Sequence, residues 1–199
     1  MTSEIISKGL AELGIKATGE QLLQFDQMLQ TLTIWNQKHN LTRLKSQRDQ
    51  EIYHVLDSLS AHQYFLGHQE VLDIGTGAGF PGIPLAIIFP DKSFHLVESN
   101  DKKIAYLRCV VQQLGLKNIH IYNRRIELFS TSKGPYDAIT ARALATPSDI
   151  LEWTTHLGIS SYILYVGPNC KVPPGGVVQP VKVPFSEKQH FILCIDQSL

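Results

Sequence analysis

Two hydrophobic patterns divide the chain near residue 66. Between residues 5 and 44, apolar residues recur every three or four positions with polar residues between them, a pattern that is typical of amphipathic helices. Gly14 and Gly19 interrupt this pattern, so it predicts a helix over about residues 3–13 and a second over about 19–38. A third helix is predicted over Gln47–Phe65.

After Gly67, short apolar runs alternate with helical stretches. The runs predict strands at 71–74, 94–97, 119–122, 138–140 and 162–166, and the stretches between them predict helices at about 81–89, 102–114 and 147–156. This alternation is typical of right-handed crossovers in a mostly parallel sheet. Two last runs, 177–183 and 191–195, are separated by a short polar turn and predict an antiparallel hairpin at the sheet edge. We therefore expect a seven-stranded α/β domain over residues 67–199 with a helical N-terminal cap over 1–66, together one compact unit.

Composition narrows the class of protein. Hydrophobic residues make up 43% of the 199 residues and charged residues 18%, enough apolar chain to bury a core. The 18 basic and 18 acidic side chains balance, which argues against a uniformly basic polyanion binder and leaves local patches as the only basis for nucleic-acid binding. No run approaches the ~20 apolar residues that cross a bilayer, and the first residues do not resemble a signal peptide. We expect a cytoplasmic monomer without membrane contact.

The cysteines and histidines give no sign of a metal or disulfide framework. Cys109, Cys170 and Cys194 are widely separated and form no C-x-x-C pair, and the histidines lack the spacing of metal ligands. We expect reduced thiols and no metal site.

The segment from Val71 to Gly82 carries the strongest chemical signal. A strand ends in a loop with glycines at 75, 77 and 79, which lets the backbone approach a ligand where a Cβ would collide. Two interpretations compete. Gly77-x-Gly79-x-x-Gly82 is the dinucleotide fingerprint, whereas Asp73-x-Gly75-x-Gly77-x-Gly79 is the loop of methyltransferases that bind S-adenosylmethionine.

Charge favours the methyltransferase interpretation. The Asp73 carboxylate suits the methionine end of a cationic cofactor but would repel a pyrophosphate. Pro81 and Pro84 also remove N–H groups that a phosphate needs. Glu98 ends the second strand 19 residues after Gly79, the position at which an acid accepts ribose hydroxyls in both classes. The alternative for Glu98 is a solvated acid at a strand end.

On these residues the sequence resembles the glucose-inhibited division protein B family, that is, the small-subunit ribosomal RNA methyltransferase G family. The resemblance extends over nearly the whole chain. It rests on Trp35-Asn36, Asn40-Leu41-Thr42, His54 with Leu56-Asp57-Ser58, the loop from Asp73 to Leu85, Val97-Glu98-Ser99, Lys102-Lys103, Arg125-Ile126-Glu127 and Arg142-Ala143.

The resemblance implies a Rossmann-like fold and methyl transfer from S-adenosylmethionine to N7 of one specific guanine in 16S ribosomal RNA, as naked RNA or in a small-subunit particle. It places Gly75 and Phe80 against the cofactor, Ile126 and Glu127 beside the adenine, and Arg142 at the methionine end or beside the target base. Gly77 joins Asp73 and Glu98 as a further cofactor-binding candidate. One departure is Val166-Gly167, where many members have Lys-Gly. If that lysine contacts RNA, this chain uses another cation, such as Lys171, or binds its substrate more weakly.

Guanine N7 has a free lone pair, so its methylation needs no general base and rests on alignment of the reacting atoms. No residue is therefore assigned as an acid or base catalyst. The chain lacks the Asn/Asp-Pro-Pro-aromatic motif of adenine amine methylation, and Cys170 has no preceding proline of the kind expected for a cytosine C5 nucleophile.

Cations cluster despite the zero net charge. Residues 38–48 and 102–125 contain several lysines and arginines and no acid. They form a phosphate footprint only if they converge near the glycine loop; otherwise they are solvated helix faces. Arg125 is the candidate RNA or base contact, with an ion pair to Glu127 as the alternative.

Five residues of the cap region are best explained structurally. Trp35 is expected in the core rather than under a base, and Asn36 and Asn40 are expected to cap or to bond the neighbouring loop. His54 and Asp57, three residues apart, are expected to share a structural hydrogen bond rather than act as an acid–base pair. Two other functions stay open at this point: a nucleotide-dependent oxidoreductase, and a non-catalytic ribosomal RNA assembly factor with a vestigial cofactor site.

Overall fold

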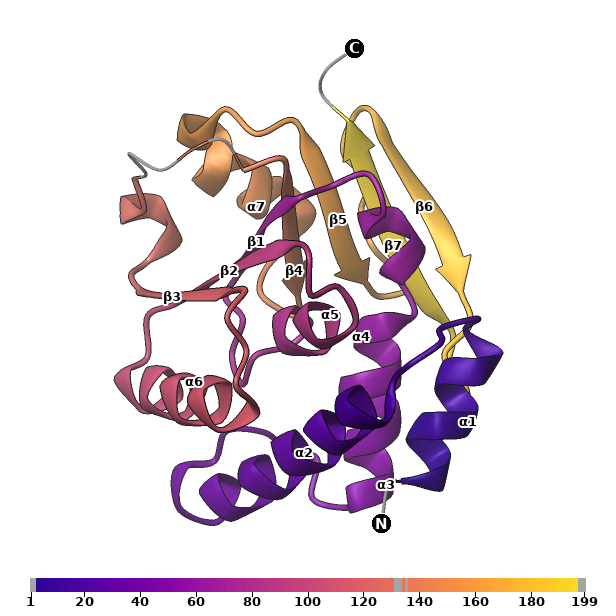
Figure 1. Ribbon diagram of the computed structural model, residues 1–199. Coiled ribbons are helices and arrows are strands. Elements are labelled where there is room, and N and C mark those ends of the chain that lie inside the picture. Colours follow the sequence, from indigo (N-terminus) through magenta and orange to yellow (C-terminus); the bar gives the residue numbers. More distant parts are fainter. Residues whose placement is uncertain (1–2, 131–133, 135, 197–199) are drawn as a thin grey trace.

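The computed structural model describes residues 3–130, 134 and 136–196, so Met1 and Thr2 lie outside the described residues. Figure 1 shows a twisted sheet flanked by helices. The strands are β1 (Glu70–Ile74), β2 (Ser93–Glu98), β3 (Ile119–Asn123), β4 (Ala138–Arg142), β5 (Ser161–Val166), β6 (Gly176–Val181) and β7 (His190–Asp196). The α-helices are α1 (Glu4–Glu12), α2 (Gly19–His39), α3 (Gln47–Gln50), α4 (Asp57–Leu59), α5 (Gly82–Ile88), α6 (Asp101–Leu114) and α7 (Pro147–Thr154). A π-helix η1 (Glu51–Leu56) and 3₁₀ turns η2 (His62–Phe65), η3 (Ile126–Leu128) and η4 (Thr155–Leu157) complete the elements.

The seven strands form one sheet in the order β3-β2-β1-β4-β5-β7-β6. Strands β1 to β5 pair in parallel, while β7 runs antiparallel to both β5 and β6. This confirms the predicted mostly parallel sheet with a C-terminal hairpin at its edge. All five parallel strands end at the same edge of the sheet, and the strand order reverses between β1 and β4, where open α/β sheets bind ligands.

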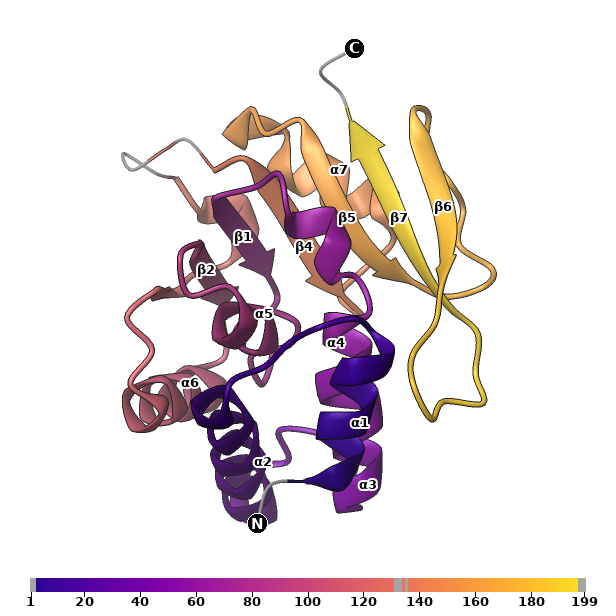
Figure 2. The same cartoon turned by 45° about the vertical axis from the view of Figure 1, so that its right-hand side comes forward.

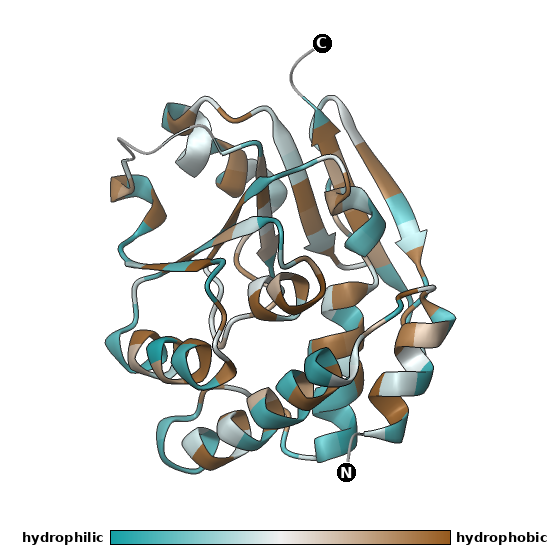
Figure 3. Cartoon of the chain, in the orientation of Figure 1, coloured by the Kyte–Doolittle hydropathy of each residue, from teal (hydrophilic) through white to brown (hydrophobic). Residues whose placement is uncertain are grey.

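Successive side chains of a strand point to opposite faces of the sheet, and helices pack against both faces. On β1, Val71 joins an apolar cluster with α1, α2, α5 and α6, while the neighbouring Leu72 joins a second cluster with α7. Figure 2 shows α7 on the opposite side of β4 and β5 from α5 and α1, and Figure 3 shows apolar positions concentrated in the strands and α5. The first cluster is continuous from Ile6 of α1 to Ile192 of β7, so cap and sheet share one core.

The predicted helix over Gln47–Phe65 is confirmed as helical over 47–59 and 62–65, but it is not a uniform α-helix. Helices α3, η1 and α4 follow one another without a gap, and at the C-cap of η1 the Asp57 N–H donates to the carbonyl oxygen of Ile52, five residues back. One carbonyl of η1, that of Tyr53, accepts a hydrogen bond from the Arg142 side chain of β4. This contact comes from 89 residues away in the chain, so local periodicity carries no signal for it.

The β6–β7 connection begins two residues before the predicted turn, so Val183 lies in the connection rather than in a strand. It spans residues 182–189, and its Val183 is buried against Ile52 and Leu56 of η1. The hairpin therefore packs onto the π-helix.

Candidate cofactor and acceptor site

The glycine loop after β1 adopts a backbone that favours glycine. Gly75, Gly77 and Gly79 have φ angles of 62°, 63° and 87°, in the left-handed region where a side chain is strained. A Cβ on Gly75 would collide with the Leu144 side chain, and one on Gly79 would collide with Ile83. The loop therefore needs glycine both for its turn and for the close approach of its neighbours.

Asp73, in β1, is hydrogen-bonded to two residues that follow it in this segment. Its side chain is fully buried, and Oδ2 accepts hydrogen bonds from Thr76 Oγ1 at 2.6 Å and from the Gly82 N–H at 2.8 Å. Burial raises the pKa of Asp73 to about 7, although the hydrogen bonds from Thr76 and Gly82 oppose the rise. Its other oxygen, Oδ1, is buried and has no hydrogen-bond partner among the described residues.

The position of Asp73 bears on the two interpretations of the loop. In a dinucleotide site the N–H groups at the start of the following helix bind the pyrophosphate. Here the Gly82 N–H, the first of α5, is already bonded to a carboxylate. The loop geometry thus disfavours a phosphate.

Glu98 closes the loop from the β2 side. Its Oε1 accepts from the Ser99 and Asn100 N–H groups at 2.9 Å each. Its Oε2 accepts from the Gly77 N–H at 3.1 Å and lies 3.4 Å from Lys103 Nζ. The side chain is only 8% exposed, so the alternative of a solvated strand-end acid is wrong. The longest of these contacts, to Lys103, is the one most readily exchanged for a ligand hydroxyl.

A cleft of about 300 Å³ opens over this loop, and we call it the glycine-loop cleft. It lies at the carboxyl ends of β1 to β4 and is lined by Gly75, Val97, Glu98, Ser99, Lys103, Arg124, Arg125, Ile126, Glu127, Ala143, Leu144 and Trp153. The structure thereby brings together Gly75, Glu98, Ile126, Glu127 and Arg125 from the predicted set. Asp73, Gly77, Phe80 and Arg142 do not line this cleft. Asp73 and Gly77 take part in the hydrogen bonds of the loop, and Phe80 stacks on His54.

Arg125 and Glu127 form no ion pair within the part of the chain that the structure describes, and both side chains are exposed at the rim. The other cations of the basic stretch 102–125 do not all lie at this cleft. Lys103 and Arg124 join Arg125 in the glycine-loop cleft, whereas Lys117 lines a separate cavity of about 640 Å³ at the amino end of the sheet. The stretch 102–125 therefore reaches the cleft only in part, and Lys45 of the stretch 38–48 lines a different cavity, beside α2.

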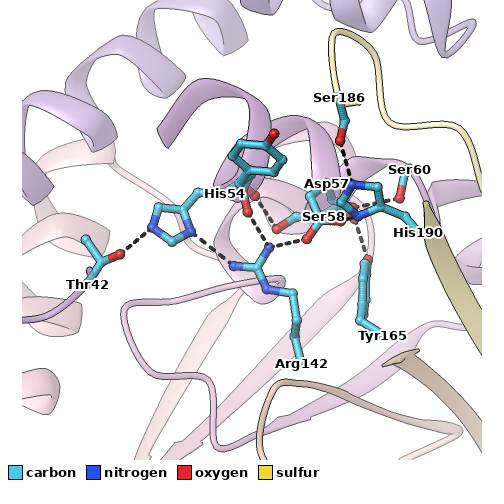
Figure 4. Close-up of polar contacts among 10 residues, drawn as sticks. Thr42, His54, Asp57, Ser58, Ser60, Arg142, Tyr165, Ser186 and His190 are labelled. Carbon is cyan, nitrogen blue, oxygen red and sulfur yellow. Dashed lines mark hydrogen bonds and ion pairs between the residues drawn. The ribbon is translucent and has the colours of Figure 1, made fainter. Parts of the chain in front are cut away.

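Arg142 lies at the end of β4 in a polar network (Figure 4). Its Nη1 donates to Asp57 Oδ2 at 2.7 Å and to the Tyr53 carbonyl oxygen at 3.0 Å, and Nη2 lies 3.3 Å from His54 Nδ1. The guanidinium stands 5.3 Å from the ring centre of Phe80. This cationic group thus joins the glycine loop to the π-helix.

His54 and Asp57 do not share the expected hydrogen bond. Each contacts Arg142 instead, and the two side chains lie on opposite sides of the guanidinium (Figure 4). His54 stacks on Phe80 with ring centres 4.3 Å apart, and its Nε2 lies 2.8 Å from Thr42 Oγ1. Burial, assisted by the Arg142 charge, lowers the pKa of His54 to about 3. The imidazole is therefore neutral near pH 7 and offers Nδ1 to Arg142 as an acceptor.

Two more cavities adjoin the end of β4. The arginine cavity, about 220 Å³, is lined by Asp57, Arg142, Ala143, Tyr165, Val166, Gly167, Val181, His190, Phe191 and Ile192. The β4–β5 cleft, about 740 Å³, is lined by Ala143, Ala145, Thr146, Pro147, Ser148, Tyr165, Val166, Gly167, Pro168, Asn169, Cys170 and Lys171. Ala143, a non-glycine residue with a φ of 54°, lines these two cavities and the glycine-loop cleft.

Sequence reasoning missed three residues of this region. Leu144 stands over Gly75, the buried Tyr165 hydroxyl donates to the Ser58 carbonyl oxygen, and His190 bonds Asp57 from β7. Only Leu144 had a local signal, because it directly follows the Arg142-Ala143 motif. The other two depend on the pairing of β5 with β7.

The structural roles expected for Trp35 and Asn36 are confirmed. Trp35 packs against the first apolar cluster, edge-on to Tyr106, and Asn36 Oδ1 accepts from the Thr42 N–H at 2.9 Å. Asn40 is the left-handed C-cap of α2.

Solved structures with a similar architecture include proteins named as methyltransferases. A human methyltransferase 10 domain containing protein matches with a TM-score of 0.61 and 14% identity, covering 87% of this chain and 96% of that chain. TrmK of M. capricolum, solved with S-adenosyl-homocysteine, matches with a TM-score of 0.56 and 17% identity over 71% of this chain and 67% of that chain. Together with the glycine-loop cleft at the carboxyl ends of the parallel strands, these likenesses define a Rossmann-like α/β fold.

The sequence comparisons identify the family. A sequence model of rRNA small subunit methyltransferase G matches residues 21–166. The enzyme of that name from Shewanella amazonensis is 39% identical over 157 residues, covering 79% of this chain and 75% of its own, and that of Shewanella sp. W3-18-1 is 32% identical over 98% of both chains. The chain belongs to the rRNA small subunit methyltransferase G family, and its cofactor is S-adenosylmethionine. The oxidoreductase alternative is thereby set aside. Among the described residues, no helix combines the length and apolar character needed to cross a membrane.

Proposed function

We propose that this protein methylates N7 of one specific guanine in 16S ribosomal RNA, presented as RNA or within a small-subunit particle. The observation that carries the proposal is the shared wall formed by Ala143. On one side lies the glycine-loop cleft with the features of a cofactor site, and on the other lies the wider β4–β5 cleft, open enough for a base.

The residues present fit S-adenosylmethionine. In the proposal, Glu98 receives the ribose hydroxyls, Ile126 and Glu127 border the adenine, and Gly75 and Gly77 supply the close backbone approach. Asp73 supports the methionine end, because its buried, unpartnered Oδ1 suits a donor or cationic group rather than an anion. Phe80 lies against the Arg142 guanidinium, which lines the adjoining cavity on the other side of Ala143.

When bound, the cofactor supplies the methyl group as an activated sulfonium. Because N7 brings its own lone pair, the protein needs to hold the base in line and to exclude water, and such alignment can supply ~7–11 kcal/mol. The neutral His54 suits this mechanism, since it takes no proton from the base and serves to orient Arg142.

Arg142 retains donors for a ligand. A guanidinium has five N–H groups, and within the described residues three of them serve Asp57, Tyr53 and His54 while Nε has no hydrogen-bond partner. We place this group beside the target base or the methionine carboxylate. Arg125, at the exposed rim of the glycine-loop cleft, is placed against RNA.

The β4–β5 cleft also contains a cation that could replace the lysine that many relatives have at position 166. Val166 and Lys171 line the same cleft, so the Lys171 ammonium is available to the RNA that enters there. We propose that Lys171 replaces the cation that many relatives have at the end of β5.

Mapping methylated guanines in ribosomal RNA from cells with and without the gene tests the proposed function. Loss of one N7-methylguanine in the small-subunit RNA, restored by a plasmid copy of the gene, is the expected result. An unchanged methylation map contradicts the proposal, and RNA binding without methyl incorporation from labelled cofactor indicates the non-catalytic assembly factor instead.

A further inference from the structure

His190 of β7 stands next to the candidate site without being part of its expected machinery. Its Nδ1 lies 2.9 Å from Asp57 Oδ1, and its Nε2 lies 2.8 Å from Ser186 Oγ (Figure 4). Its ring also stacks on Tyr53 of the π-helix, with ring centres 6.3 Å apart. His190 lies beyond residues 21–166, the part of the chain that the family comparison matches.

The hydrogen bonds around His190 define where its proton lies. The Lys188 N–H donates to Ser186 Oγ, so the Ser186 hydroxyl is free to donate to His190 Nε2. A neutral imidazole that accepts at Nε2 carries its proton on Nδ1, where it faces Asp57. The loop between β6 and β7 thus fixes the tautomer that binds the carboxylate.

Asp57 connects His190 to the arginine. Asp57 Oδ1 pairs with His190 Nδ1, and Asp57 Oδ2 pairs with Arg142 Nη1, so each partner contacts a different carboxylate oxygen. Burial raises the pKa of Asp57, but the hydrogen bond of His190 and the charge of Arg142 outweigh burial and hold that pKa below its ordinary value. Asp57 is therefore an ionised, fully engaged carboxylate whose orientation depends on both partners.

Ser186, His190 and Asp57 are bonded in the same sequence as the serine, histidine and aspartate of a hydrolase triad. The residues and cavities around them indicate another role. Ser186 lines none of the three cavities around the end of β4, and the far side of Asp57 is occupied by Arg142. The chain of bonds ends on the guanidinium, in the arginine cavity, which shares Tyr165 and Val166 with the β4–β5 cleft.

We propose that His190 is a positioning residue for methyl transfer: by holding Asp57, it fixes the direction of Arg142 toward the ligands. The hairpin of β6 and β7 thereby contributes to the site from outside the matched part of the chain. This inference rests on the proposed function, because it assigns the orientation of Arg142 to the alignment of the target base. Removal of the bond loosens the arginine without removing any group that touches cofactor or RNA.

Three variants test the role of His190. His190→Phe keeps a ring over Tyr53 but removes the donor, His190→Asn restores a donor near the Nδ1 position, and His120→Phe is the matched control, an exposed histidine on β3. We expect His190→Phe to lower kcat about tenfold, the scale of one lost hydrogen bond to a charged group, with S-adenosyl-homocysteine affinity and the KM for RNA changed less than about twofold. His190→Asn recovers most of the loss, and His120→Phe leaves kcat unchanged.

An unchanged kcat in His190→Phe overturns the inference, and so does a loss that His190→Asn fails to recover. Assays run well below each variant's measured unfolding temperature separate positioning from stability. A wild-type chain that methylates no RNA contradicts the proposed function instead. In that case ¹⁵N NMR of the Arg142 guanidinium still decides the inference: His190→Phe is expected to shift its signals, and unshifted signals contradict the positioning role.

Discussion

Asp57 and Arg142, 85 residues apart in the chain, form a buried ion pair with 2.7 Å between Oδ2 and Nη1. Each side chain is less than 15% exposed. The pair links the end of β4 to α4, which follows the π-helix. This contact between cap and sheet also positions Arg142, a candidate site residue.

Loss of the Asp57 charge is expected to destabilise the fold. Asp57→Asn leaves the Arg142 guanidinium buried without a counter-ion, which costs about 3–5 kcal/mol in comparable buried pairs. Urea unfolding measures the free energy of unfolding. Glu12→Gln, which removes the exposed partner of Lys182, is the control and is expected to change stability far less. Equal losses in both variants would show that the buried pair has no special weight.

Substitution of Gly75 is expected to weaken cofactor binding. Alanine at this position meets the Leu144 side chain and pushes it into the glycine-loop cleft. Gly115→Ala is the matched control, because Gly115 has a similar φ of 67° but no atom within 4 Å of the added Cβ. Both variants carry about 1–2 kcal/mol of backbone strain, yet only Gly75→Ala is expected to lose affinity for S-adenosyl-homocysteine in a calorimetric titration. Unchanged affinity in folded Gly75→Ala contradicts the placement of the cofactor.

Asp73 is expected to make the stability of the fold fall with rising pH. Its pKa is about 7 in the folded chain against 3.8 unperturbed, so between these values the folded state binds the proton that the unfolded state has lost. The free energy of unfolding then decreases as pH rises from about 4 to 7, by a contribution on the order of 4 kcal/mol. Asp73→Asn removes this contribution. Parallel stability profiles of wild type and Asp73→Asn between pH 4 and pH 7 would contradict the raised pKa.

How far the sequence predicts this molecule depends on the range of the contacts. Strands such as β1 and β2 were predicted because side-chain alternation and glycine placement act over a few residues. The gathering of Gly75, Glu98 and Ile126 was also predictable, since the carboxyl ends of parallel strands share one edge. The π-helix was not, because the partner of its Tyr53 carbonyl oxygen is an arginine from β4, 89 residues away in the chain. The same holds for His190, which meets Asp57 only through the pairing of β7 with β5.

Arg125 is expected to act on RNA alone. Because its exposed side chain lies at the rim of the glycine-loop cleft, Arg125→Ala should lower RNA methylation at subsaturating RNA while cofactor affinity is retained. Lys16→Ala, an exposed cation outside both basic stretches, is the control. A parallel loss of cofactor affinity would assign Arg125 to the cofactor instead.

Lys171 and Val166 offer an exchange experiment. Lys171→Ala is expected to weaken RNA binding and to reduce its salt dependence, since one phosphate contact is lost. Adding Val166→Lys to that variant returns a cation to the same cleft and should restore much of the affinity, measured by filter binding over a salt series. No recovery, with the double variant folded, would show that the two positions do not serve the same phosphate.

Ala143 lines all three cavities around the end of β4 with a φ of 54°. A longer side chain would project into at least one of them, and a β-branched residue would add strain at this φ. Glycine relieves the strain but leaves the chain between Arg142 and Leu144 freer to move. Both larger side chains and glycine are therefore disfavoured at position 143. We expect only very small residues to be tolerated there, even though Ala143 itself has no reactive group.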